Sequence, residues 1–474
     1  MQQYALQING KPVMTEQTFD VIDPALGKPF AACSKADAAL VNKAVAAASE
    51  AFPAWRNTPL TERAALLNKL ADAMEANMPA LMELVTREVG KPMGGLNGIG
   101  SGMEVGGAIA WTRYTTSLQL PVDVLQDDDA MRVEVHRKPL GVIASVTPWN
   151  WPLMIGIWHI MPALLAGNTV VMKPSEFTPL STIKMVELAN EILPAGVLNL
   201  VAGDGETGSV LTTHKDVAKI VFTGSTATGK KIMEGASASL KRLTLELGGN
   251  DAGILLPDFD MALLPKLFTT CFHNNGQTCA CLKRLYVHSS IYDEVANGLA
   301  AIARDTIVGN GLNEASQLGP VQNKMQFDKV IDLAAATKAQ GATILSGGEP
   351  LDTEGYFFPP TVYANVKDGD RIVDEEQFGP LLPVISYDDI DEVISRANQN
   401  ENGLGGSVWS ADIGKAAELA KQLETGTVWI NEHGAVQPNA PFGGVKQSGL
   451  GVEFGDYGLD EYVSLQTLMI PKAS

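Results

Sequence analysis

The sequence predicts an α/β fold with two or three structural units. Its 474 residues exceed what one hydrophobic core normally supports. Between residues 141 and 249, short apolar runs typical of strands alternate with helical segments, and a second alternation follows from 250 to about 430. Such alternation predicts parallel sheets with helices on both faces.

The first quarter of the chain reads as helical. Residues 36–52, 60–77 and 101–119 are rich in Ala, Leu and Glu or Met, with apolar residues at helical spacing. The pattern changes at residues 131–135, where charged and apolar residues alternate as in a strand with one exposed face.

Five strands are predicted in the first alternating region. They lie in the segments GVIASVTP, NTVVMKPSE, GVLNLVAG, AKIVFTGS and KRLTLELGG. Strands separated in this way by helical segments form a parallel sheet, which is a nucleotide-binding layout.

The second alternating region predicts a separate α/β unit with its own core. Its strand-like segments are AGILL, RLYVHS, ATILSGG, LLPVISY, GGSVWS and GTVWIN. The tail, DEYVSLQTLMIP, also alternates but has no local partner in the sequence. We expect it to add a strand to another sheet, such as one in a second subunit.

The composition disfavours nucleic acid as a partner. Asp and Glu outnumber Lys and Arg by 54 to 35, so the net charge is −19. The N-terminus lacks a basic region followed by an apolar run, and the longest apolar stretch, residues 152–172, is interrupted by polar residues, Pro and Gly. Four cysteines are too few for a disulfide framework. We therefore expect a cytoplasmic protein without a membrane partner.

The glycine-bearing turn that starts at Gly224 nearly matches a P-loop. A P-loop requires Ser or Thr after its lysine to coordinate Mg²⁺, and this chain has Lys231 there. A nucleoside triphosphatase and a simple chain reversal are the alternatives at this turn. Lys173 and Glu176, just past a predicted strand, favour a dinucleotide instead, because an acidic side chain there can accept the ribose hydroxyls of adenosine.

The segment HNNGQTCACLKR contains two cysteines separated by one residue. Its Cys and His spacing matches no zinc motif, so no metal site is predicted. Core packing is the interpretation for Cys33, Cys271 and Cys281. Cys279 follows a polar, glycine-containing turn, so we expect an accessible thiol that can act as a nucleophile.

Seven motifs in order along the chain resemble the NAD(P)-dependent aldehyde dehydrogenase superfamily, and the resemblance covers essentially the whole chain. They are PWN at 148–150, KPSE at 173–176, FTGS at 222–225, LELGG at 245–249, GQTC at 276–279, EEQFGP at 375–380 and PFGGVKQSG at 441–449.

The resemblance implies oxidation of an aldehyde to a carboxylic acid through a thiohemiacetal and a thioester on Cys279. Asn150 and the backbone N–H of Cys279 would stabilise the oxyanion. Glu246 would activate the water that hydrolyses the thioester and could help to deprotonate the thiol. If the resemblance is set aside, the sequence around Glu246 favours a surface glutamate at the end of a strand. A catalytically silent structural or binding protein on the same scaffold is the other alternative.

The resemblance also implies NAD as the cofactor, with NADP possible because Lys173 is present. The implied cofactor-binding residues are Trp149, Lys173, Glu176, Gly224, Ser225, Glu376 and Phe378. Trp149 would line the adenine side or simply pack. The carboxylate of Glu176 favours NAD because it would repel a 2′-phosphate.

For the substrate, the resemblance implies a set of side chains along an aldehyde tunnel. These residues are Trp151, Ile155, Trp158, Thr278, Ala280 and Val436. Their aromatic and aliphatic character favours an uncharged apolar or aromatic aldehyde, although ordinary core packing would also explain them.

The family's domain organisation carries over with boundaries in this numbering. A Rossmann-like NAD-binding domain would comprise residues 1–119 and 139–248, and a second α/β domain, the catalytic one, residues 249–431. Residues 120–138 and 455–474 would form an oligomerisation segment, and 432–454 a linker and active-site loop. We therefore expect a homodimer or homotetramer.

Overall fold

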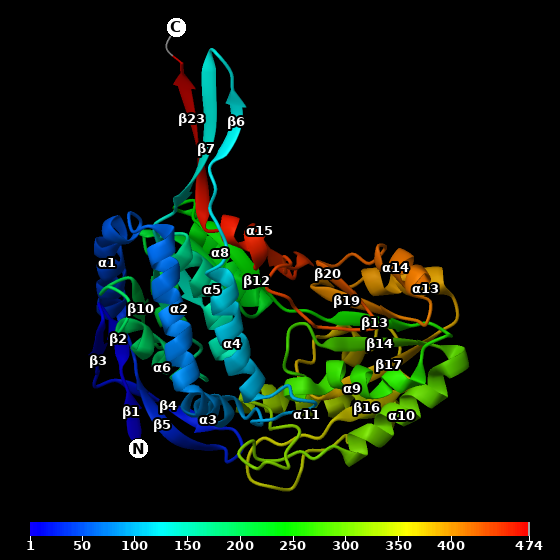
Figure 1. Ribbon diagram of the computed structural model, residues 1–474. Helices are drawn as coiled ribbons and strands as arrows, with labels where there is room; N and C mark the ends of the chain where they lie inside the picture. Colours follow the sequence, from blue (N-terminus) through cyan, green and yellow to red (C-terminus); the bar gives the residue numbers. More distant parts are fainter. Residues whose placement is uncertain (473–474) are drawn as a thin grey trace.

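The computed structural model describes residues 1–472 and contains two α/β bodies and a projecting β arm (Figure 1). Most of the buried apolar side chains of the first body form one cluster, and those of the second body form two others. In Figure 1 the blue-to-green part of the chain builds one body and the green-to-orange part the other.

The first body is organised around an eight-stranded sheet that includes all five predicted strands. In order across the sheet these are β22 (Gly449–Leu450), β12 (Arg242–Glu246), β11 (Val217–Thr223), β8 (Val142–Val146), β9 (Thr169–Lys173), β10 (Leu198–Leu200), β2 (Leu6–Ile8) and β3 (Lys11–Val13). The five predicted strands are mutually parallel. The chain proceeds from β8 outward in one direction and then returns to build the other side, which creates a ligand-binding crevice beside β8.

Helices cover this sheet in two groups. They are α1 (Ala38–Trp55), α2 (Leu60–Ala76), α3 (Met78–Val89), α4 (Ser101–Thr115), α5 (Pro152–Leu165), α6 (Leu180–Asn190), α7 (Gly205–Thr213) and α8 (Thr226–Ser237). Helices α1, α7 and α8 pack in one group and α2 to α6 in the other. Right-handed crossovers in opposite directions place such groups on opposite faces.

The helical interpretation of the first quarter is incomplete. Its three predicted helices correspond to α1, α2 and α4, but β2 and β3 and a further small sheet precede them. That sheet contains β1 (Gln2–Tyr4), β5 (Lys28–Ser34) and β4 (Thr18–Asp23). Strands β1, β2 and β3 have three residues each, too few to show a periodic pattern, whereas β4 and β5, with six and seven residues, are long enough and were not predicted.

The second body has a seven-stranded sheet in which only the outermost pair is antiparallel. Its strands are β15 (Thr343–Ser346), β16 (Thr361–Ala364), β17 (Leu381–Tyr387), β14 (Leu282–His288), β13 (Asp251–Leu255), β19 (Gly405–Trp409) and β20 (Thr427–Ile430). The six predicted strands are present, and β16 was not predicted. Its helices are α9 (Leu264–Phe272), α10 (Tyr292–Asp305), α11 (Lys324–Ala339), α12 (Arg371–Asp374), α13 (Ile390–Asn398) and α14 (Ile413–Ala420).

Short elements complete the chain. Three 3₁₀ turns, η1 (Met261–Leu263), η2 (His273–Gly276) and η3 (Ser289–Ile291), precede α9, β14 and α10. Strands β18 (Asn402–Gly403) and β21 (Val445–Lys446) pair with each other, and α15 (Gly455–Asp460) leads into the last strand.

The arm is a three-stranded antiparallel sheet, to which the tail adds a strand as expected, although the sheet belongs to the same chain and not to a second subunit. It contains β6 (Asp123–Asp127), β7 (Met131–Pro139) and β23 (Val463–Pro471), and it projects away from the body in Figure 1. The tail strand β23 pairs with β7 of the same chain along its full length. The sequence pattern could not reveal this partner because it lies far away in the chain. Residues 473–474 of the predicted oligomerisation segment lie outside the described residues.

Among residues 1–472, none of the helices combines the length and apolar character that a bilayer span requires.

Candidate active site

A left-handed turn follows α9 and leads the chain to Cys279. Asn274, Asn275 and Gly276 have φ angles of 51°, 55° and 72°, a backbone region that asparagine and glycine tolerate better than other residues. A Cβ atom at Gly276 would lie 2.2 Å from the carbonyl oxygen of Gly379 and 2.6 Å from Nζ of Lys283. Only glycine therefore fits this position, and the turn directs the chain from the helix to the cysteine.

Cys279 is half-buried at the junction of two cavities. The first, the sheet-end cavity, has a volume of about 720 Å³ and lies at the carboxyl ends of β8, β9 and β11. The second, the aromatic cavity, has a volume of about 580 Å³. Cys279 belongs to the lining of both, so a ligand in either cavity reaches the same thiol.

The structure brings the predicted residues together in two sets. The sheet-end cavity is lined by Asn150 and by all the predicted cofactor residues: Trp149, Lys173, Glu176, Gly224, Ser225, Glu376 and Phe378. The aromatic cavity is lined by all the predicted substrate residues: Trp151, Ile155, Trp158, Thr278, Ala280 and Val436. Glu246 lines neither cavity.

The sheet-end cavity has the features of a dinucleotide site. Lys173 ends β9, and its Nζ lies 3.9 Å from a carboxylate oxygen of Glu176. Ser225 is the N-cap of α8, where backbone N–H groups and the helix dipole favour a phosphate. Glu376 accepts a hydrogen bond of 3.0 Å from the backbone N–H of Gly249. Burial raises the pKa of Glu376 to about 7.

The P-loop interpretation is not supported. In a P-loop the lysine after the second glycine reaches the phosphates, whereas Lys230 donates to Oε1 of Gln447 at 2.7 Å. No group of three or more His, Cys, Asp or Glu side chains that could hold a metal occurs within residues 1–472.

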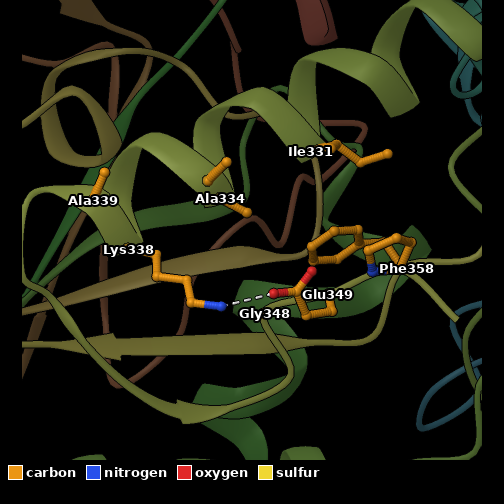
Figure 2. A pocket seen from close by; sticks show the side chains of 9 residues that line it. Ile331, Ala334, Lys338, Ala339, Gly348, Glu349 and Phe358 are labelled. Atoms are coloured by element: carbon orange, nitrogen blue, oxygen red, sulfur yellow. Dashed lines mark hydrogen bonds and ion pairs between the residues drawn. The ribbon is translucent and has the colours of Figure 1, made fainter.

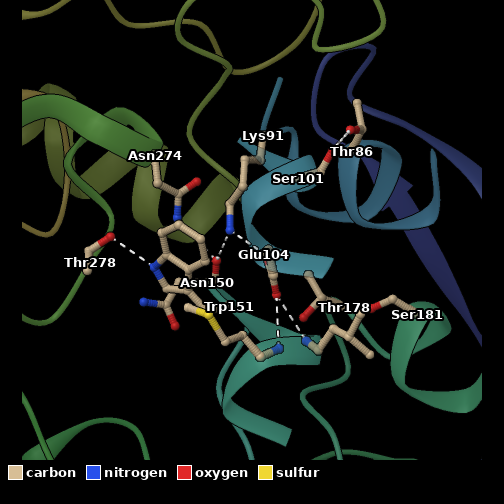
Figure 3. A network of polar contacts seen from close by, with 12 residues as sticks. Thr86, Lys91, Ser101, Glu104, Asn150, Trp151, Thr178, Ser181, Asn274 and Thr278 are labelled. Atoms are coloured by element: carbon tan, nitrogen blue, oxygen red, sulfur yellow. Dashed lines mark hydrogen bonds and ion pairs between the residues drawn. The ribbon is translucent and has the colours of Figure 1, made fainter. Parts of the chain in front are cut away.

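Asn150 is held in place from both its side chain and its backbone (Figure 3). Its side-chain amide donates to the carbonyl of Gln277 at 2.9 Å, two residues before the cysteine. Its carbonyl oxygen accepts hydrogen bonds of 3.1 Å from Nζ of Lys91 and 3.1 Å from the amide of Asn274. Three hydrogen bonds therefore join Asn150 to its surroundings, two of them to the turn that presents Cys279.

A buried ion pair supports this arrangement and was missed in the sequence. Lys91 and Glu104 have no exposed side-chain surface and form a salt bridge (Figure 3). Glu104 also accepts hydrogen bonds of 3.0 and 3.4 Å from the first backbone N–H groups of α5. Nζ of Lys91 lies 3.1 Å from the ring centroid of Trp151, a cation–π contact. The only sequence signal was an isolated glutamate in an apolar helix.

Glu246 is a buried carboxyl group without a hydrogen-bond partner. Neither of its side-chain oxygens has one among the described residues. Burial, together with the nearby carboxylate of Glu453, raises the pKa of Glu246 well above its usual range. Glu453 lies 3.3 Å from Nε2 of His159, and burial together with Lys219 lowers the pKa of this histidine to about 3. Sequence reasoning did not identify Glu453 or His159.

The two neighbouring cysteines have opposite environments. Burial and the charge of Glu246 raise the pKa of the Cys279 thiol. Burial alone would also raise the pKa of Cys281, but His273 and Lys283 bring it below its ordinary value. Nε2 of His273 is 3.8 Å from the sulfur of Cys281. Cys281 has no exposed surface, which agrees with the packing role predicted for it.

The aromatic cavity is mostly apolar and has one ion pair in its lining. Trp111 and Phe442 contribute to its lining beside the predicted tryptophans, and neither was identified in the sequence. Trp151 donates from its indole N–H to Oγ1 of Thr278 at 2.9 Å. Lys266 and Glu432, both in the lining, form an ion pair of 2.6 Å and are partly exposed.

A smaller cavity of about 380 Å³ lies elsewhere in the second body, beside α11 (Figure 2). Its walls are mostly apolar, and Lys338 and Glu349 form an exposed ion pair of 2.9 Å at its side. It contains no nucleophile or buried acid, so it is not a candidate active site.

Comparison with known proteins agrees with this geometry. The model of the aldehyde dehydrogenase family matches residues 13–468. Phenylacetaldehyde dehydrogenase of Pseudomonas fluorescens is 40% identical over 96% of this chain and 93% of its own. Aldehyde dehydrogenase 1A1 of Equus caballus is 39% identical over 95% of this chain and 91% of its own. The NAD⁺ complex of an aldehyde dehydrogenase from Bacillus cereus superposes with a TM-score of 0.96 at 35% identity, covering 99% of this chain and 97% of that one.

We predict that a thiol reagent modifies Cys279 well before Cys281. Access decides the order, because Cys279 faces two cavities whereas Cys281 is fully buried. Acidity alone would give the opposite order. Peptide mass spectrometry during reaction with iodoacetamide measures both rates, with Cys279→Ser as the control. Faster labelling of Cys281 would contradict the prediction.

We predict that Lys91→Met lowers the free energy of unfolding by about 3–5 kcal/mol, because it leaves Glu104 as an unpaired buried charge. The double variant Lys91→Met, Glu104→Gln should recover part of the lost free energy of unfolding. Unfolding in urea measures the stability of the single and the double variant. Lys338→Met is the matched control, since its ion pair is 62% and 71% exposed and should contribute about 0–1 kcal/mol. A double variant less stable than Lys91→Met would refute this account.

Proposed function

The chain belongs to the aldehyde dehydrogenase family and is an NAD(P)-dependent enzyme, and on this premise we propose that it oxidises an apolar or aromatic aldehyde to the carboxylic acid, with Cys279 as nucleophile. The observation that carries the proposal is the position of Cys279 between a polar cavity at the sheet end and an apolar, aromatic cavity. Such a thiol can meet a cofactor on one side and an aldehyde on the other.

NAD⁺ is the proposed cofactor, and the residues of the sheet-end cavity fit it. Thr147 lines this cavity and has a buried hydroxyl without a partner among the described residues. Lys173 and Glu176 would hold the adenosine ribose, and Gly224 and Ser225 the pyrophosphate. The carboxylate of Glu176 would repel the additional phosphate of NADP⁺.

The remaining cofactor contacts are proposed in the same cavity. Glu376 would hold the nicotinamide ribose, and Phe378 would pack against the nicotinamide. Trp149 meets Phe378 edge to face with 5.2 Å between ring centroids, a contact that favours packing beside the nicotinamide over a place at the adenine. When bound, NAD⁺ supplies the hydride acceptor for the oxidation.

Asn150 is proposed to stabilise the oxyanion that forms when Cys279 adds to the aldehyde carbon. Its side-chain amide has two N–H groups, and one is used by the carbonyl of Gln277. The other can donate to the oxyanion, together with the backbone N–H of Cys279. Donors fixed in advance in this way are effective because they need no reorganisation during the reaction, and losing one typically costs about 10²–10³-fold in rate.

Glu246 is proposed as the general base. Its raised pKa makes it a stronger proton acceptor than an ordinary carboxylate. It can take the proton of the Cys279 thiol, and after passing that proton to solvent it can take another from the water that hydrolyses the thioester. The missing hydrogen-bond partners of its carboxylate support a role that requires freedom to approach a water molecule.

The substrate class is inferred from the aromatic cavity. Its walls contain several tryptophans, and its one lysine is already paired with Glu432. A charged aldehyde would lose hydration in this cavity without gaining a partner. The name of the relative from Pseudomonas fluorescens, phenylacetaldehyde dehydrogenase, supports an aromatic aldehyde. We also propose a cytoplasmic location, where the four free thiols stay reduced.

The experiment measures the oxidation of a panel of aldehydes with NAD⁺ or NADP⁺, monitored through the absorbance of the reduced cofactor. We expect the largest kcat/KM with aromatic or apolar aldehydes and NAD⁺, and no turnover by Cys279→Ser. Glu246→Gln should form NADH in a single turnover, slowed by the loss of the base that deprotonates the thiol, and then stall with thioester on Cys279, detectable by mass spectrometry. Undiminished steady turnover by Glu246→Gln would remove the proposed role of this residue. Release of phosphate from ATP would instead favour a triphosphatase.

The arm is proposed to make the protein a homodimer or homotetramer. It exposes several apolar side chains: Val124, Leu125, Leu465, Leu468, Met469 and Ile470. Burial of such a surface against a second copy would stabilise an oligomer. Sedimentation at micromolar concentration should give at least twice the chain mass of 50.4 kDa, and Met469→Glu should weaken the association. A monomeric wild type would overturn the proposal.

A further inference from the structure

A loop in the second body forms one wall of the aromatic cavity. Residues 431–436, here called the cavity loop, follow β20 directly, and five of them line the cavity. The loop also touches the nucleophile segment, since a Cβ atom at Gly434 would lie 2.6 Å from the carbonyl oxygen of Ala280. The position of this loop therefore affects both the width of the cavity and its distance from Cys279.

His433 fastens the cavity loop to the sheet beneath it. The side chain of His433 has no exposed surface, and its Nε2 lies 3.2 Å from Oδ2 of Asp251, the first residue of β13. Its Nδ1 lies 2.9 Å from Oγ of Ser407, in the middle of the adjacent strand β19. One imidazole thus joins the loop to two neighbouring strands.

The partners of His433 are themselves fixed, and this assigns the ring proton. The hydroxyl of Ser407 accepts a hydrogen bond of 2.9 Å from the indole N–H of Trp409, so its own proton can point to Nδ1 of His433. Nε2 then carries a proton, which it donates to Asp251. Asp251 uses its other oxygen to accept from the backbone N–H of Gly405 at 3.1 Å.

Ser407, His433 and Asp251 are the residue types of a hydrolytic Ser-His-Asp triad, but here the serine is not accessible to a substrate. Ser407 has no exposed surface and lines neither active-site cavity. A nucleophilic serine must reach a substrate, and this one lies within the sheet. The three residues are therefore suited to hold structure in place.

Two further contacts restrain the cavity loop on its outer side. Trp429 donates from its indole N–H to the carbonyl of Ala435 at 2.9 Å, and its ring lies 4.9 Å from that of His433. Glu432 pairs with Lys266 of α9 at 2.6 Å. These contacts lie at partly exposed positions, whereas the contacts of His433 are buried and are therefore the stronger restraint.

We propose that Asp251, His433 and Ser407 form a positioning triad that fixes the cavity loop and thereby determines which aldehydes the aromatic cavity accepts. This inference rests on the proposed function for the identity of the substrate. His433 acts through the loop and not on the reacting atoms. A large aldehyde that fills the cavity depends on the loop wall, whereas a small one placed beside Cys279 does not.

The test compares His433→Phe, which keeps ring volume but removes both hydrogen bonds, with His433→Gln, which keeps a donor for Asp251. Phenylacetaldehyde and propanal are the probes. For His433→Phe we expect about a tenfold increase in KM for phenylacetaldehyde, with kcat within about twofold and propanal kinetics nearly unchanged, because uniform binding is lost and not chemistry. His433→Gln should lie between the wild type and His433→Phe.

Hydrogen–deuterium exchange of the free protein measures the loop without any substrate. Peptides covering the cavity loop should exchange faster in His433→Phe. Tyr387→Phe is the matched control, because it removes one buried hydrogen bond of 2.9 Å, to Leu255 at the far end of β13. Its loop exchange and kinetics should be unchanged.

An equal loss of kcat/KM for both aldehydes in His433→Phe would overturn the proposal. Unchanged hydrogen exchange of the cavity loop in this variant would overturn it too, as would faster exchange without an effect on KM for phenylacetaldehyde. If the wild type oxidises neither aldehyde, the proposed function fails. Loop exchange would then still show whether the triad holds the loop.

Discussion

The buried ion pair of Lys91 and Glu104 is the interaction on which the active site depends. Glu104 accepts from the first N–H groups of α5, and Lys91 donates to the carbonyl of Asn150 and lies against the ring of Trp151. A charge pair without solvent is stable only when its remaining hydrogen-bonding capacity is used. Here the remaining hydrogen bonds go to Asn150, which lines the sheet-end cavity, and to the start of α5, which lines the aromatic cavity. The contacts that stabilise the ion pair therefore also hold both cavities in position around Cys279.

A second constraint is the burial of two carboxyl groups, Glu246 and Glu453, near the thiol of Cys279, because burial disfavours the charged form of all three groups. Glu246 and Glu453 are both buried, and two carboxylates so close cannot both carry a charge at low cost. The pair therefore retains a proton at a pH where ordinary carboxyl groups have lost theirs. Burial raises the pKa of both thiols, but Glu246 raises that of Cys279 further, whereas His273 and Lys283 bring that of Cys281 below its ordinary value. Reactivity in this site thus depends on access and on a nearby proton acceptor more than on the intrinsic acidity of the thiol.

The sequence was informative where a pattern is local and uninformative where contacts are distant. Strands β8 to β12 and the turn before Cys279 have clear periodicity or composition, and the residues predicted for each cavity lie in that cavity. Lys91, His159, Glu453 and His433 left no such signal, because a buried charge is distinguished from a surface charge only by partners far away in the chain. The three-residue strands near the N-terminus were missed because they are too short for a period, and the partner of the tail strand because it lies far away in the chain.

The arm has a consequence for how the protein is made. Strand β7 is synthesised early, but its partner β23 is the last strand of the chain, with roughly three hundred residues between them. While the ribosome is still translating, β7 has one unpaired edge, and an unpaired edge is a site of unwanted association. The sheet can be completed only after the C-terminus has left the ribosomal exit tunnel. If the arm joins subunits as proposed, only finished chains can assemble.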